Sequence, residues 1–115
     1  MYWWLLTSAY HKVSQDLRLQ IIPSGDVIQS LRGLDNFDST QSGISLCRDG
    51  FHMHLIYGRY AVAATWYECI LNGNILENDF IPVSQDDKTN NKLIRLIKNT
   101  VHNICKEYKT RGRIL

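Results

Sequence analysis

Asp49 and His52 are the residues whose types and spacing could do chemistry in this chain. They lie in the stretch Arg48-Asp49-Gly50-Phe51-His52-Met53-His54, where the carboxylate precedes the imidazole closely enough to fold back onto the ring. The carboxylate then accepts a hydrogen bond from one ring nitrogen and leaves the other free to take a proton. This is the base of a hydrolytic triad with its orienting carboxylate. No Gly-Asp-Ser or Gly-x-Ser-x-Gly pattern supplies a nucleophile, so we expect only half of a triad here.

The same stretch allows other interpretations. Asp49, His52 and His54 could ligate a metal ion, but no further ligand follows them in the sequence. Asp49-Gly50 is also a common turn pair, and His52 could be a purely structural loop residue. We assign Asp49 and His52 as the catalytic candidates, and we expect neither a metal nor a cofactor.

The three cysteines, Cys47, Cys69 and Cys105, are widely spaced and give neither a disulfide framework nor a zinc signature. Cys69 and Cys105 fall within apolar helical patterns, which predicts small buried hydrophobic residues. Cys47 is close to Asp49, but no base is evident beside it, so we do not assign it as a nucleophile.

The composition excludes several classes of protein. A length of 115 residues suits one domain, and 44% hydrophobic with 21% charged residues is ordinary globular usage. A formal net charge of +2 implies no polyanionic partner, and the basic tail at 106–113 is interpreted as a solvated helix end, not a nucleic-acid contact. The apolar start at 1–6 is too short for a membrane span and lacks the basic residues of a signal peptide. We expect no membrane span, and the localisation stays open.

Apolar residues at helical spacing predict four helices around the Asp49–His52 stretch. The first is amphipathic, with Leu6, Tyr10, Val13 and Leu17 on one side. The third is apolar nearly all round, which predicts that it is largely buried. The last carries a single apolar stripe that ends at Tyr108. These helices would cover residues 2–19, 27–32, 58–71 and 91–108.

One segment between the first two predicted helices has the composition of a β-strand. Residues 19–23, Leu-Gln-Ile-Ile-Pro, are short, β-branched and closed by a proline. A lone strand would leave its backbone groups unpaired, whereas a strand alternating with helices belongs to a parallel α/β sheet. We therefore predict an α/β fold, mostly helical with about one core strand, in which residues 1–115 are the C-terminal portion of a single domain. An irregular arm at 75–83 would be anchored by Phe80, Ile81 and Pro82.

Two blocks together resemble a known family. Asp49-Gly50-Phe51-His52, followed by Gly58-Arg59-Tyr60-Ala61-Val62-Ala63-Ala64-Thr65-Trp66-Tyr67-Glu68, resembles the C-terminal end of the SGNH (GDSL-type) hydrolase superfamily, in a bacterial branch. Residues 10–26 are similar to the helix and last strand that precede the family's catalytic loop, so the resemblance covers roughly residues 1–108. It implies a flavodoxin-like three-layer α/β/α fold, of which this chain would be a C-terminal fragment.

The resemblance also implies an activity. His52 would be the general base of a serine esterase, and Asp49 would hold its tautomer and stabilise the imidazolium. The parent would hydrolyse ester bonds, such as O-acyl groups on carbohydrates. The family's Gly-Asp/Asn-Ser nucleophile motif and its Gly and Asn oxyanion donors have no match here. The expected partners are a small-molecule or carbohydrate ester substrate and either a missing N-terminal segment or a second copy. The alternative is a small helical binding module with no catalytic activity.

Overall fold

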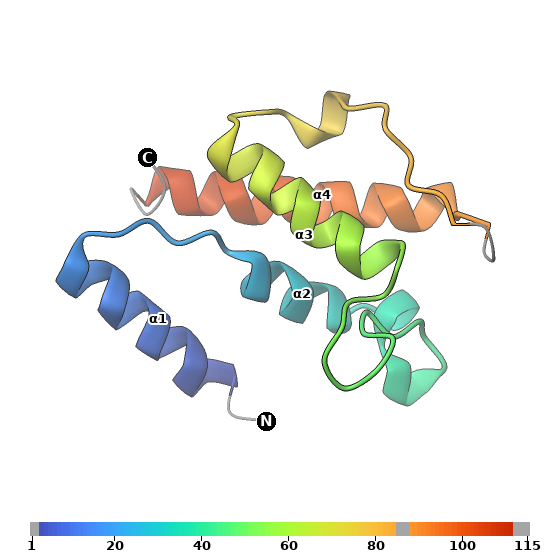
Figure 1. The fold of residues 1–115 in the computed structure, drawn as a ribbon, viewed down its shortest axis with the longest axis horizontal. Coiled ribbons are helices and arrows are strands. Elements are labelled where there is room, and N and C mark those ends of the chain that lie inside the picture. The colour runs from blue at the N-terminus through green and yellow to red at the C-terminus, as the bar shows by residue number, and fades with distance from the viewer. Residues whose placement is uncertain (1–2, 85–87, 112–115) are drawn as a thin grey trace.

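The structure, a computed structural model, describes residues 3–84 and 88–111. Within these residues the chain forms four α-helices, α1 (Trp3–Leu17), α2 (Ser24–Arg32), α3 (Tyr57–Ile70) and α4 (Asn91–Thr110) (Figure 1). Short 3-10 turns interrupt the connections at η1 (Asp35–Phe37), η2 (Ser39–Gln41) and η3 (Ile75–Glu77). The four predicted helices are thus confirmed, and α2 begins earlier than expected because residues 24–26 are already helical.

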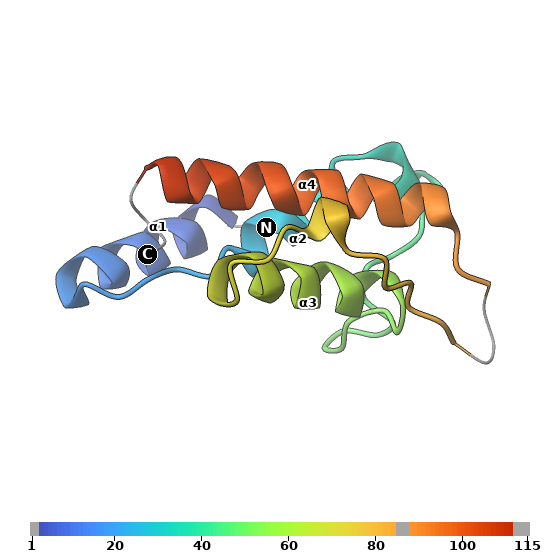
Figure 2. The ribbon, with the colours of Figure 1, turned by 90° about the horizontal axis from the view of Figure 1, so that it is seen from above.

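Helices α2, α3 and α4 pack on one another around a single core, and α3 crosses α4 (Figures 1 and 2). The predicted apolar stripe of α4 is buried at Leu93, Ile97, Val101 and Tyr108, and Ile104 is half-buried against the same core. Burying each large apolar side chain contributes roughly 1.5–3 kcal/mol, so this interface is the main source of stability. The connections add Phe37, Leu46, Ile56 and Ile75 to it. Its other members from the helices include Val27, Ile28, Leu31, Tyr57, Tyr60, Ala61, Ala64, Leu93, Ile94 and Ile97.

Helix α1 lies to one side of these three helices and buries none of its residues (Figure 1). The apolar side that predicted the helix, from Leu6 to Leu17, is at least half exposed. Trp3 makes a close contact with α2, since a Cβ at Gly25 would lie 2.6 Å from its ring. The sequence pattern therefore predicted the helix correctly, but the described part of the chain does not cover its apolar side.

The predicted strand at 19–23 is wrong. Those residues run irregularly from α1 into α2, and across residues 3–84 and 88–111 the only β pairing is an isolated bridge between Cys47 and Met53. The Ile22 and Pro23 carbonyls accept hydrogen bonds from Ser24 and Val27, so this backbone turns into α2 instead of pairing sideways. The α/β expectation, including the three-layer fold implied by the resemblance, is corrected to a small all-helical domain.

Two predictions about burial also need correction. Helix α3 buries one side only, because Trp66 and Ile70 on its other side are about half exposed. The arm after α3 is anchored by Ile75, which is 3% exposed, whereas Phe80 is 65% exposed. No helix among the residues described is both long and apolar enough to cross a membrane.

Candidate functional site

The Asp49–His52 stretch forms a closed loop in front of α3. Its base is the bridge between Cys47 and Met53, flanked by a 3.0 Å hydrogen bond from Arg48 N to His52 O and a 2.7 Å bond from His54 N to Leu46 O. Between these bonds the loop projects outward. Phe51 at its tip is 92% exposed. The backbone thus holds the two ends of the loop while residues 49–52 between them are exposed.

Asp49 organises the tip of this loop through both of its oxygens. Its Oδ1 accepts hydrogen bonds from the backbone N–H groups of Phe51 and His52, each 2.7 Å long. Its Oδ2 lies 2.8 Å from Nδ1 of His52. An aspartate that binds the amides two and three positions ahead is a local turn motif, which explains why this short sequence folds this way by itself.

The electrostatics of the pair follow from these hydrogen bonds. The backbone N–H of Phe51, then the His52 ring and the His52 backbone N–H, hold the pKa of Asp49 below its ordinary value of 3.8. An ionised Asp49 accepts the Nδ1 proton of a neutral His52, so Nε2 is left as the acceptor nitrogen. The Asp49 and His52 side chains are 47% and 60% exposed, so water screens the pair.

His54 has a structural role that the sequence did not reveal. Its Nδ1 accepts hydrogen bonds from Ile56 N and Tyr57 N, both 3.2 Å long, and its ring stacks on Tyr57 at 5.3 Å. Because the N-cap residue Ile56 makes no side-chain cap, His54 caps α3 in its place. Among the residues that the structure describes, no group of three His, Cys, Asp or Glu side chains could hold a metal ion, so the metal interpretation finds no support.

Gly58 fixes the loop against the first turn of α3. A Cβ at this position would lie 2.4 Å from the Leu46 carbonyl oxygen and 3.1 Å from Cβ of Met53. Only glycine allows this approach without a shift of the backbone. On the other side of the loop, Arg32 donates a 3.3 Å hydrogen bond to Sγ of Cys47, which ties the loop to the end of α2.

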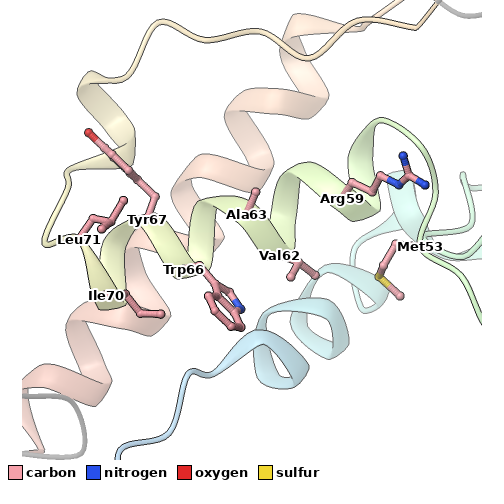
Figure 3. A pocket seen from close by; sticks show the side chains of 8 residues that line it. All are labelled: Met53, Arg59, Val62, Ala63, Trp66, Tyr67, Ile70 and Leu71. Carbon is pink, nitrogen blue, oxygen red and sulfur yellow. The ribbon is translucent and has the colours of Figure 1, made fainter.

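An apolar hollow of about 620 Å³ runs along the exposed side of α3 (Figure 3). It begins at Met53, the residue after His52, and Arg59 is its one charged residue. Val62 and Trp66 project from the same side of the helix, and Trp66 is about half exposed although the nearly all-apolar pattern of residues 58–71 predicted burial. The other lining residues are Ala63, Tyr67, Ile70 and Leu71.

A histidine with this carboxylate can accept a proton and return it, but no nucleophile is hydrogen-bonded to it among the described residues. Nε2 of His52 makes no hydrogen bond to a serine or any other side chain within residues 3–84 and 88–111. The geometry therefore contains an imidazole and a carboxylate that contacts its Nδ1. The catalytic roles of Asp49 and His52 stay a prediction.

Comparison with known proteins gives one match. No curated protein and no solved structure is significantly similar to this chain. The family described as "Domain of unknown function (DUF4886)" matches residues 1–104, which contain α1, α2, α3, the loop with Asp49 and His52, and the greater part of α4. Since this match covers most of the 115 residues, the chain belongs to the DUF4886 family.

Proposed function

We propose that this chain supplies the general-base half of a serine ester hydrolase of the SGNH type. His52 is the base, and Asp49 is the carboxylate that positions it. The observation that carries the proposal is the 2.8 Å contact between Asp49 Oδ2 and His52 Nδ1, made while two backbone amides hold the other carboxylate oxygen. A carboxylate fixed at three points sets both the tautomer and the direction of the ring.

The proton path follows from this tautomer. A serine hydroxyl near Nε2 of His52 loses its proton to that nitrogen as its oxygen attacks the carbonyl carbon of an ester. Asp49 stabilises the resulting imidazolium. His52 then returns the proton to the departing alcohol, and the same cycle with water releases the acid. The serine and the oxyanion donors come from a polypeptide segment other than residues 1–115, in which their motifs have no match.

The surface around the loop supports a covering segment. Phe51 is almost fully exposed at the tip, and the apolar hollow on α3 begins at Met53. An exposed aromatic side chain next to an apolar hollow offers a covering segment apolar surface to bury. A segment lying there would also exclude water from His52, which strengthens every electrostatic interaction of the base.

The test compares the chain alone with the product of its natural locus, including all coding sequence joined to it. Both are assayed on p-nitrophenyl acetate and on an acetylated oligosaccharide. We expect the chain alone to equal its His52→Ala variant, and the longer product to lose at least about 100-fold in activity when His52 is replaced. His102→Ala is the matched control, since this histidine pairs with Glu68 away from the loop. An active longer product that tolerates His52→Ala would refute the proposal.

A binding module without catalysis is the second candidate, favoured by the apolar hollow on α3. Trp66 and Ile70 are half exposed there, beside a single cation, Arg59. On this alternative Val62→Asp abolishes partner binding, and His52→Ala has no effect on any activity of the locus. The His52→Ala variant therefore separates the candidates, because only the esterase proposal expects it to remove activity.

A further inference from the structure

Two buried cysteines that were predicted to be independent apolar residues lie against each other. Cys69 is in the last turn of α3, and Cys105 faces it from α4, 36 positions later in the chain. Their Sγ atoms are 3.2 Å apart, and the residues are 4% and 0% exposed. A disulfide bond is about 2.05 Å long, so its formation needs the two sulfur atoms to approach by only about 1 Å.

A polar network next to the pair holds the two helices in this register. The buried Glu68 side chain accepts hydrogen bonds from His102 Nδ1 on α4 and from Ile75 N, both 2.9 Å long. Lys109 Nζ donates a 3.1 Å bond to the Glu68 carbonyl oxygen. These contacts join the end of α3 to α4 on both sides of the cysteine pair. Sliding of one helix past the other, which would separate the sulfur atoms, is thereby opposed.

The two thiols also differ in acidity. The hydrogen bond between the two thiols lowers the pKa of Cys69, with a smaller contribution from Lys109, whereas the same contact and burial raise the pKa of Cys105. Cys69 is therefore the thiol that ionises first. Because the thiolate is the reactive species, Cys69 is the attacking group in an exchange reaction.

We propose that Cys69 and Cys105 form a disulfide site that links α3 to α4 in the presence of a low-molecular-weight disulfide. The Cys69 thiolate attacks one sulfur of the small disulfide, which forms a mixed disulfide and releases one small thiolate. That thiolate takes the Cys105 proton, and Cys105 then attacks Sγ of Cys69 and displaces the second small thiolate, which takes up the proton that Cys69 released to solvent. Two protein thiols are oxidised, and one small disulfide is reduced to two thiols. This inference does not depend on Asp49 or His52.

Access to Cys69 comes from the end of α3. The helix stops one residue later at Ile70, and the next residues, Leu71 and Asn72, are exposed, with Asn72 at a φ of 53°. Helix ends open locally at far lower cost than the core does, so Sγ of Cys69 becomes reachable without global unfolding. The bond, once formed, closes a loop that contains η3 and the linker to α4, and it restricts the unfolded chain accordingly.

The test uses the reduced protein and oxidised glutathione, with intact mass and peptide mapping as readouts. We expect a loss of two hydrogens and a single cross-linked peptide pair containing residues 69 and 105. The Cys47→Ser variant is the matched control and should give the same product, with a higher urea midpoint after oxidation than before. Cys105→Ser should stop at the glutathione adduct of Cys69.

The same reaction in urea keeps the test decisive if a serine variant does not fold. The unfolded chain should give mixed pairings that include Cys47, because nothing then selects one pair. A native protein that retains all its thiols while the unfolded protein oxidises would overturn the proposal. A native product linked through Cys47 would overturn it equally.

Discussion

Replacing Gly58 by alanine tests whether the first turn of α3 positions the loop that carries Asp49 and His52. The new Cβ would lie 2.4 Å from the Leu46 carbonyl oxygen, which already accepts a 2.7 Å hydrogen bond from His54 N. Overpacking of this kind costs about 1–3 kcal/mol, and weakening the hydrogen bond adds about 1 kcal/mol. The higher helix propensity of alanine returns about 1 kcal/mol. We expect a net loss of about 1–3 kcal/mol in the free energy of unfolding.

The assay is urea unfolding followed by far-ultraviolet circular dichroism, with the amide resonances of Phe51 and His52 as a local probe of the loop. Gly50→Ala is the matched control, because a Cβ at position 50 meets nothing within 4 Å. It should change the free energy of unfolding by less than about 0.5 kcal/mol. If Gly58→Ala is as stable as the parent and leaves those resonances in place, the close contact is not what holds the loop.

Three further predictions concern single side chains. Glu68→Ala removes a buried carboxylate that binds His102 and Ile75, and should lower the free energy of unfolding in urea by about 2–3 kcal/mol. The control is Glu107→Ala, in an exposed pair with Arg111, which should lower it by less than about 0.5 kcal/mol. His54→Ala removes the cap of α3 and should cost about 1 kcal/mol by the same assay, and an unchanged midpoint would contradict the capping role. The pKa of Asp49 is lower in the folded protein than its ordinary value of 3.8. Its contribution to stability is therefore present above pH 3.8 and is lost as the pH falls through the pKa of the folded state. The Phe51 and His52 amide shifts should therefore titrate below pH 3.8, and titration above that value would contradict the hydrogen-bond geometry.

The sequence predicted local features well because each depends on residues close together in the chain. The period of α4 places its apolar stripe on one side whatever it packs against, and Asp49 reaches His52 because the chain between them is short. The cap made by His54 and the contact at Gly58 were missed, since neither leaves a pattern in composition or periodicity. Gly58 in Gly58-Arg59-Tyr60 was a visible signal, but its partner is a backbone atom of Leu46, and sequence spacing does not reveal such contacts.

The strand at residues 19–23 failed for a physical reason. β-branched residues predict an extended, half-buried segment, and Ile21 and Ile22 do pack against the core. A strand also needs a neighbour to receive its backbone hydrogen bonds, and the described chain provides none at this place. The apolar pattern therefore predicted the partial burial of Ile21 and Ile22, but Leu19 is exposed, and the secondary structure depended on a partner that the pattern does not contain.

The exposure of His52 and the hollow on α3 are connected by the proposed function. The contact between Asp49 and His52 is exposed, so water screens its electrostatic interaction. The hollow begins at Met53, which directly follows His52 in the chain. A segment that covers the α3 hollow from Met53 to Trp66 would therefore also lie beside the loop and remove water from the base. Binding of that segment and activation of His52 would then be one event. It follows that Val62→Asp, which places a carboxylate in the hollow, should reduce esterase activity of the complete protein together with binding of the segment. Because Val62 also packs against the core, circular dichroism must show that the variant is folded. If the variant loses binding of the segment but keeps full activity, Asp49 and His52 work without a covering segment.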